Sequence, residues 1–280
     1  MGAFGDFSRI NTNIQALDAL RRFQLTNQNL GDRQLRLATG KRINRAEDDS
    51  AGFHIAKKLE ARVRGQAQAL ANIGDAKSML TVAEGSLGTI MEILQTMKEK
   101  VVQAANDTMG TDERTAIKNQ LDALSAEIDE IVGDTTFNGT SLFSASAQTS
   151  FTFQVNAEQG DTFSVTLATL SASNLSVAIG DLTVASAASA GATLARIDTA
   201  ITTIANVLAN IGDSQKRLTF KQDALSTAIT NYEAARSRIE DADFAKEQME
   251  IVKLQILQQT GIASLAQANS GPQAILQLLQ

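Results

Sequence analysis

The 280-residue chain contains no cysteine and a single proline, Pro272. Without cysteine, disulfide bonds and thiolate metal sites are excluded. Proline makes up about 5% of an average protein, and because it interrupts helices, its near absence allows long uninterrupted ones. The chain is therefore not a disulfide-stapled protein, and long helices are permitted.

Aromatic side chains are also scarce: there is no Trp and one Tyr, and aromatic residues make up 4% of the chain. Aromatic residues supply much of the buried area of a globular core, so a compact globule is not expected. The apolar residues are mainly Leu, Ile, Val and Ala, which suit seams between packed helices.

The single histidine, His54, leaves little room for catalysis. Zinc sites built from paired histidines and HExxH proteases are excluded. A Ser-His-Asp arrangement would need His54, which lies in "AGFHIAKK" at the expected start of a helix. We therefore expect no enzymatic activity, no metal and no cofactor.

The formal net charge is −6, with 12 Lys/Arg against 7 Asp/Glu in residues 1–65 and an acidic remainder. An acidic chain without a basic aromatic stripe argues against nucleic-acid binding. No apolar run reaches about 18 residues, so no membrane insertion is expected. The first residues lack the apolar core of a cleavable secretory signal. This fits a cytosolic protein, and also one exported without cleavage.

The spacing of apolar residues predicts long helices. Between Ala76 and Ala104, apolar residues recur at alternating intervals of four and three, which is the pattern of a coiled-coil seam. The same alternation runs through 117–131 and 194–239, and more weakly through 16–37. A helix over about residues 52–106 would extend about 80 Å, so an elongated molecule is expected.

The middle of the chain has a different pattern. The alternation in "SFTFQV" and "TFSVTL", joined by the polar "NAEQGD", predicts a β-hairpin with one apolar face. "TTFNG" contains an Asn-Gly turn signal. Residues 168–193 are rich in Ser, Ala and Thr, with weak strand character around 175–185. The predicted fold is mainly α: an elongated antiparallel helical bundle or coiled coil built from both chain ends, with a small β-hairpin region in the middle.

One polar stretch, "RINRAEDDSAG" (42–52), lies between two stretches with helical spacing. Its acidic run, Glu47 to Asp49, has two interpretations. The carboxylates could bind a divalent cation, or Asp48 or Asp49 could cap the helix that follows.

The ends of the chain resemble bacterial flagellins. At the N-terminal end the resemblance is carried by "INTN", "RLATGKRINRAEDDSAG", "AEGSLGTIMEILQTM", "VQAAND" and "TTFNG". At the C-terminal end it is carried by "RIDTAI", "YEAARSRIEDADFAKE", "QILQQTGIASLAQAN" and "ILQLLQ". These motifs cover about four-fifths of the chain, in the order found in the family.

The resemblance implies a structural subunit that self-assembles into the extracellular filament of the bacterial flagellum and serves swimming motility. Implied partners are further copies of the chain, the flagellar cap, the hook-junction proteins, an export chaperone and other flagellins. The implied organisation is an inner-core helix over 1–45, rod helices over 46–140, a β-hairpin and Ser/Thr-rich surface segment over 141–190, a rod helix over 191–239 and an inner-core helix over 240–280. We expect roughly residues 1–45 and 240–280 to be disordered in the monomer and to fold only on assembly.

The resemblance also suggests three groups of site residues. "RINRAEDDSAG" becomes the joint between core and rod, with subunit contacts made by Arg42, Asn44, Arg45, Asp48 and Asp49. The inner-core helices are expected to pair through Ile14, Leu17, Leu20, Phe23, Leu30, Leu37, Ile251, Leu254, Ile256, Leu257, Leu265, Leu276 and Leu279. The segment by which the vertebrate innate flagellin receptor recognises many family members corresponds here to Gln95, Thr96, Lys98, Glu99 and Lys100.

The receptor segment departs from the family pattern at two positions, where Thr96 replaces a usual Arg and Lys100 a usual Leu. Losing a fork-shaped donor and an apolar contact predicts weak recognition. Two other identities fit parts of the sequence. A hook–filament junction protein shares the terminal architecture, and a cytosolic coiled-coil scaffold would explain the seams but not the matched ends.

Overall fold

The structure is a computed structural model that describes residues 12–143 and 150–278, with side chains as far as residue 270. It divides into two compact units. The terminal unit contains the residues up to 61 together with those from 231 on, and the bundle unit contains residues 62–230. Helices α2 (Ser50–Ala104) and α4 (Ala187–Glu240) contribute to both units.

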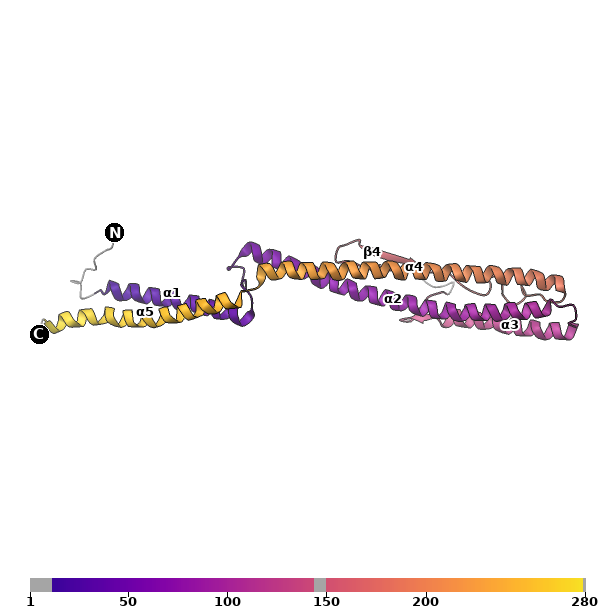
Figure 1. Cartoon of the computed structure of the whole chain (residues 1–280), viewed down its shortest axis with the longest axis horizontal. Helices are drawn as coiled ribbons and strands as arrows, with labels where there is room; N and C mark the ends of the chain where they lie inside the picture. Colours follow the sequence, from indigo (N-terminus) through magenta and orange to yellow (C-terminus); the bar gives the residue numbers. More distant parts are fainter. Residues whose placement is uncertain (1–11, 144–149, 279–280) are drawn as a thin grey trace. The chain divides into compact units, whose positions relative to one another are not determined.

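The bundle unit consists mainly of α2, α3 (Thr111–Asp134) and α4, which lie side by side (Figure 1). All nine residues of the predicted four-three seam on α2 are fully buried. They pack in one apolar cluster with residues of α3 and α4 such as Leu121 and Ile204. The predicted coiled-coil seam is therefore confirmed, and it forms the core of this unit. Its members are Ala76, Leu80, Ala83, Leu87, Ile90, Leu94, Met97, Val101 and Ala104.

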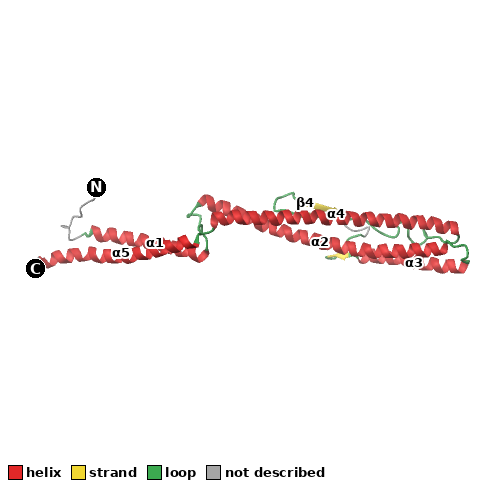
Figure 2. Ribbon diagram, viewed as in Figure 1, coloured by secondary structure: helices red, strands yellow, loops and turns green. Residues whose placement is uncertain are grey.

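Two small antiparallel hairpins follow α3 (Figure 2). Strands β1 (Thr136–Phe137) and β2 (Thr140–Ser141) flank the predicted Asn-Gly turn, in which Asn138 has φ 50° and Gly139 φ 76°. Strands β3 (Ser150–Gln154) and β4 (Thr162–Thr166) form the predicted larger hairpin, with Phe151 opposite Val165.

The loop of the larger hairpin docks on α2. Asn72 donates a side-chain hydrogen bond to the carbonyl oxygen of Gln154 (3.1 Å), and Arg62 pairs with Glu158. Gly65 is packed against Ala157: a β-carbon added to Gly65 would be 2.8 Å from the Ala157 side chain. The hairpin is thus held by both polar contacts and a close backbone approach.

The Ser/Thr-rich stretch after β4 contains no strand among its described residues, contrary to the weak strand character expected around 175–185. Successive turns replace it, closed by bonds such as Val177 N to Ala172 O (2.9 Å), and Ser176 has a left-handed backbone with φ 58°. An extended strand cannot include such a residue. Most of its apolar side chains are nevertheless buried against the bundle, whereas Ile179 is exposed. The buried ones are Leu167, Leu170, Ala172, Leu175, Val177, Leu182 and Val184.

The terminal unit pairs α1 (Ile14–Thr39) with α5 (Phe244–Leu278) in antiparallel orientation (Figure 1). Gly40 ends α1 in the left-handed conformation that glycine adopts most easily, with φ 70°. Among the side chains that the structure describes, the buried part of this pairing is small: Leu30, Ile251 and Leu254, with Leu37 against them. Both ends of the chain therefore pair as helices, and the predicted mainly α fold with a small hairpin region is confirmed.

Candidate functional site: the joint and the terminal helices

The loop singled out in the sequence lies beside a second linker, and the two segments, residues 40–49 and 239–243, are together called the joint below. The backbone N–H of Arg42 donates to the carbonyl oxygen of Glu240 (2.7 Å), and that of Ala242 donates to the carbonyl oxygen of Gly40 (2.9 Å). Lys41 and Asp241 form an isolated antiparallel bridge. The two linkers, about 200 residues apart in sequence, are therefore hydrogen-bonded to each other like a two-strand ladder.

Asp48 closes the turn within the first linker. One of its carboxylate oxygens accepts the backbone N–H groups of Asn44 and Arg45, both at 3.0 Å, and the other accepts a hydrogen bond from Arg36 (3.0 Å). The backbone hydrogen bond from Arg45 is the main cause that lowers the pKa of Asp48. Asp48 is thus held as an anion by donors of its own chain.

Asp49 caps α2. Its side chain accepts the backbone N–H of Gly52 (2.9 Å), which is the third helical residue, as in a standard N-cap. Of the two interpretations of the acidic run, helix capping is therefore the one that the geometry supports. The described residues contain no group of three or more acidic or histidine side chains arranged to hold a metal ion.

The remaining predicted joint residues also have partners within the chain. Arg42 donates to the carbonyl oxygen of Ile239 (2.7 Å), and Asn44 donates through its amide to that of Lys41 (2.9 Å). Arg45 pairs with Glu47 at 2.9 Å, and this contact is the main cause that raises the pKa of Arg45. Both of these side chains are more than half exposed. Arg45 and Glu47 are therefore accessible to a neighbouring molecule, whereas Asp48 and Asp49 mainly build the joint itself.

Four charged residues of the joint region were not identified from the sequence. Lys41 pairs with Glu240 at 2.7 Å, and Arg33 pairs with Glu247 at 2.8 Å. Each pair joins residues that are far apart in the chain, so local spacing could not reveal it. The only available signal was the excess of basic residues near the N-terminus, which here face acidic residues near the C-terminus.

The pairing residues expected from the sequence divide into two groups. Leu30, Ile251 and Leu254 are buried against one another with Leu37, and Phe23 and Leu265 are half-buried. The other expected pairing residues with described side chains are exposed: Ile14, Leu17, Leu20, Ile256 and Leu257. The side chain of Leu276 and the whole of Leu279 lie outside the described residues.

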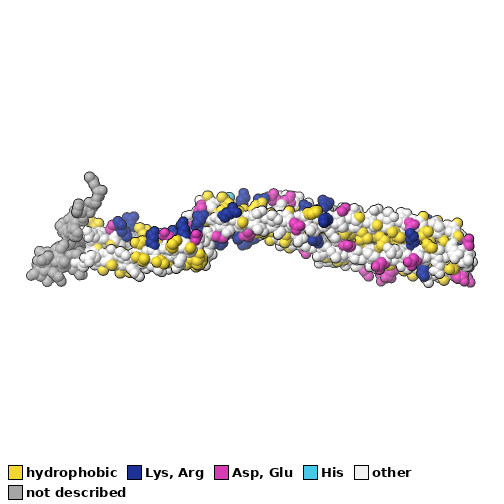
Figure 3. Space-filling model, in the orientation of Figure 1, with side chains coloured by type: hydrophobic (Ala, Val, Ile, Leu, Met, Phe, Trp, Pro, Cys, Tyr) yellow, Lys and Arg dark blue, Asp and Glu magenta, His cyan; other side chains and the backbone are white. Residues whose placement is uncertain are grey.

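Exposed apolar side chains are frequent on both terminal helices, and yellow patches are visible over this unit in Figure 3. A helix whose apolar side chains are exposed all round is a candidate for packing against another molecule. Besides the exposed pairing residues named above, the set includes Leu25 and Leu35 on α1 and Phe244, Met249, Val252 and Ile262 on α5.

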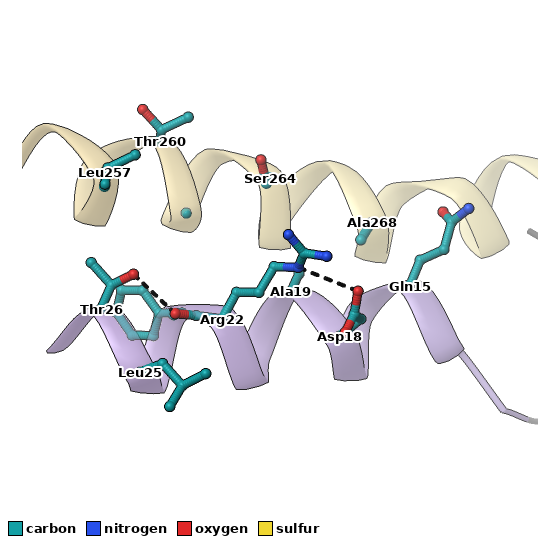
Figure 4. Close-up of a pocket in the computed structure, with 12 residues that line it drawn as sticks. Gln15, Asp18, Ala19, Arg22, Leu25, Thr26, Leu257, Thr260, Ser264 and Ala268 are labelled. Carbon is teal, nitrogen blue, oxygen red and sulfur yellow. Dashed lines mark hydrogen bonds and ion pairs between the residues drawn. The ribbon is translucent and has the colours of Figure 1, made fainter. Parts of the chain in front are cut away.

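A groove of about 630 Å³ runs between α1 and α5. Figure 4 shows the side chains of Asp18 and Arg22 on α1, which are joined by an ion pair of 3.4 Å, in the stretch that faces Ser264 and Ala268 of α5. The α5 wall is formed mostly by small residues, which leave the groove open between the helices. The groove contains polar and apolar groups but no catalytic constellation.

The receptor segment lies on α2 within the bundle unit. Gln95, Thr96 and Glu99 are exposed, and Lys98 and Lys100 are half-buried. Lys98 pairs with Asp198 of α4 at 2.7 Å. Thr96 and Lys100, the two departures from the family pattern, therefore belong to an outward-facing stretch of helix.

Both ends of the chain match known family descriptions. Residues 10–148 match the bacterial flagellin N-terminal helical region, and residues 194–279 match the bacterial flagellin C-terminal helical region. A flagellin of Halalkalibacterium halodurans is 36% identical over 272 residues, which cover 97% of this chain and 99% of the relative. A Bacillus subtilis flagellin is 36% identical over 305 residues, with 97% and 100% covered.

Solved structures agree with this assignment. The Bacillus cereus flagellin structure superposes with a TM-score of 0.50 at 30% identity, over 59% of this chain and 94% of that one. A putative flagellar hook-associated protein from Vibrio parahaemolyticus gives a TM-score of 0.60 over 69% of this chain and 100% of that one; its 18% identity shows a shared fold alone. The chain belongs to the bacterial flagellin family, the structural proteins of the flagellar filament.

Proposed function

We propose that this flagellin assembles into the filament through its terminal unit, in which α1 and α5 pack against the terminal helices of neighbouring copies. The observation that carries the proposal is the number of large apolar side chains exposed on these two helices, for example Leu17 at 59% and Ile256 at 58%. Fully burying an exposed side chain of this kind stabilises by about 1.5–3 kcal/mol, and these partly covered side chains would gain a share of that. A helical homopolymer would bury them.

Under this proposal, residues 1–45 and 240–280 form the inner core of the filament, and residues 46–140 and 191–239 form the surrounding rod helices. The segment 141–190 lies on the outside. Arg42, Asn44, Arg45, Asp48 and Asp49 make or support contacts between subunits at the joint. The intrachain bonds of Asp48 and Asp49 favour a supporting role for these two, and the exposure of Arg45 favours a direct contact.

We also propose that the chain leaves the cell uncleaved through the flagellar export apparatus and functions outside it. Its partners would then be the export chaperone, the hook-junction proteins, the cap and other flagellins. The lack of cysteine supports this route, because a chain without disulfides can pass a narrow channel in unfolded form.

The test is polymerisation of the purified chain under salt, followed by electron microscopy. We expect the wild type to form filaments and Ile256→Gln to form few, with unchanged helix content in the bundle unit. Gln255→Asn, an exposed polar position one residue away, serves as the matched control. Wild-type protein that stays monomeric under every seeding condition would contradict the proposal.

A second test concerns the joint. Arg45→Ala removes an exposed cation, and we expect it to alter filament length or shape while circular dichroism of the monomer stays unchanged. Glu47→Ala, which removes its neighbour in the same turn, shows whether the effect belongs to Arg45 or to the ion pair. Normal filaments from Arg45→Ala would show that the loop is only a solvated, capped turn.

Weak recognition by the vertebrate flagellin receptor is also proposed. Thr96 donates its hydroxyl to the carbonyl oxygen of Glu92 on its own helix, and so offers no fork-shaped donor to a partner. We expect Thr96→Arg combined with Lys100→Leu to increase receptor activation by purified monomer at least about tenfold, as expected for restored central contacts. Full activation by the wild-type chain would contradict this proposal.

A further inference from the structure

Two buried carboxylates stand out in the terminal unit. Glu240 at the end of α4 and Glu247 in the first turn of α5 are each 5% exposed. Among the residues whose side chains the structure describes, no other charged side chain is buried to this degree. Charged groups are almost never fully buried unless they are paired, so the partners of these two residues matter.

Both carboxylates bind cations from the N-terminal part of the chain. Nη1 of Arg33 donates to both carboxylate oxygens of Glu247, at 2.8 and 2.9 Å. Nζ of Lys41 donates to Glu240 at 2.7 Å, and Arg236 approaches the other oxygen of Glu240 at 3.8 Å. These two ion pairs, seven residues apart on the C-terminal side, thus join the chain ends beside the backbone hydrogen bonds between residues 40–42 and 240–242.

The apolar contact between α1 and α5 does not define a unique alignment. Among the residues whose side chains are described, only Leu30, Ile251 and Leu254 form its buried apolar cluster, and leucine recurs at position 37. If α1 moved by seven residues, Leu37 would occupy the place of Leu30, so the central apolar contact would be preserved, and only the partly buried position of Leu37 would change, to Asn44. Gly40 would then occupy the place of Arg33, and Glu247 would be buried without its cation.

Energetics favour a role in specificity for these pairs. A buried ion pair is often no more stable than well-packed apolar residues, but a buried charge left without its partner is strongly destabilising. The pairs therefore penalise wrong alignments more than they stabilise the right one, as single buried polar residues do in coiled coils.

We propose that Glu240 and Glu247 are positioning residues that fix the alignment of α5 against α1 of the same chain. This inference rests on the proposed function, in which the terminal helices pair in the filament, and it names the residues that specify the pairing. Each carboxylate acts through the cation of its own chain that it holds.

Engineered disulfides can report the alignment, because the natural chain contains no cysteine. A β-carbon at position 261 would lie 4.0 Å from that of Phe23, which suits a disulfide. Phe23→Cys with Gly261→Cys therefore reports the observed alignment. Phe23→Cys with Ala268→Cys reports the alignment shifted by seven residues. Both cysteine pairs are introduced into the full chain, which is oxidised under polymerising salt. The disulfides that form within one chain are then measured.

In the wild-type background we expect the 23–261 disulfide to dominate. In Arg33→Leu/Glu247→Leu we expect the ratio of the 23–261 to the 23–268 disulfide to fall at least about tenfold, with helix content retained. Glu250→Leu/Lys253→Leu removes an exposed ion pair within α5 and should leave the ratio unchanged. A ratio unchanged in Arg33→Leu/Glu247→Leu, or the lack of a 23–261 disulfide in the wild-type background, would overturn the proposal.

Charge exchange provides a second measurement. Each single variant, Arg33→Glu or Glu247→Arg, should raise the lowest protein concentration at which filaments form by at least about tenfold. The double variant Arg33→Glu/Glu247→Arg should restore it, whereas a mixture of the two single variants should not, since the pairing is within one chain. Rescue by the mixture, or no rescue by the double variant, would refute the inference. If the wild type fails to polymerise, the proposed function fails, and the disulfide ratio still decides the alignment.

Discussion

Single residues decide how the larger hairpin docks on α2. Gly65→Ala would place a β-carbon 2.8 Å from the side chain of Ala157, so the hairpin loop must move. We expect a loss of about 1–3 kcal/mol in the free energy of unfolding from this overpacking. Gly85→Ala, in the same helix with open space around it, should stabilise by up to about 1 kcal/mol. Urea unfolding measures both; changes of the same sign would contradict the docking.

Asp48 makes the joint sensitive to acid. Its pKa in the folded chain is lowered, mainly by the backbone hydrogen bond from Arg45. A group whose pKa is lowered by folding stabilises the fold at neutral pH, and this stabilisation is lost as the pH falls through the lowered pKa. We expect hydrogen exchange at the amides of Asn44 and Arg45, corrected for intrinsic rates, to accelerate below about pH 4.

Asp48→Asn is the control for this acid response. It should exchange faster at neutral pH already and show no further acceleration in acid, because the titrating group is gone. The raised pKa of Arg45 keeps its cation charged throughout this range, so Arg45 does not contribute to the change. An acid response that persists in Asp48→Asn would assign it to other carboxylates.

At the level of elements, the start of α2 depends on one side chain. Asp49→Ala removes the acceptor for the N–H of Gly52, and a lost N-cap costs about 0.5–2 kcal/mol. We expect the first turn of α2 to fray, measured as faster hydrogen exchange at Gly52 and Phe53. Glu47→Ala, two residues earlier and more than half exposed, should leave these amides unchanged. Equal effects of both substitutions would mean that negative charge near the start of α2, rather than the N-cap hydrogen bond, stabilises its first turn.

Helices were more predictable from the sequence than the contacts between them. The seam from Ala76 to Ala104 could be identified because a four-three period allows one face of one helix to be buried, whatever its partner. The turns after β4 could not, because their apolar residues lie on successive turns, one of them with the left-handed Ser176, and follow no regular period. Glu240 and Glu247 were missed for another reason: their partners lie about 200 residues away along the chain.

For the molecule as a whole, the sequence indicated that the two ends pair, and the structure adds how weakly they do so. As far as residue 270, where the described side chains end, the buried apolar core of the α1–α5 pairing consists of three residues with Leu37 against them. The bundle unit, in contrast, buries a continuous seam along α2, α3 and α4. The two units should therefore differ widely in stability when the chain is dilute.

This difference leads to a prediction for assembly. Ordering each backbone residue costs about 1–2 kcal/mol, and isolated helices are marginal in water. The few buried side chains of the α1–α5 pairing offset little of this cost, since residues such as Met249, at 67% exposure, gain nothing until another copy covers them. We expect limited proteolysis of dilute monomer to remove roughly residues 1–45 and 240–280 first, leaving the bundle unit intact. In filaments the same residues should resist cleavage, because neighbouring copies supply the missing burial. Chain ends that resist equally in dilute monomer would mean that the α1–α5 pairing is stable by itself, and that assembly is not coupled to folding of the ends.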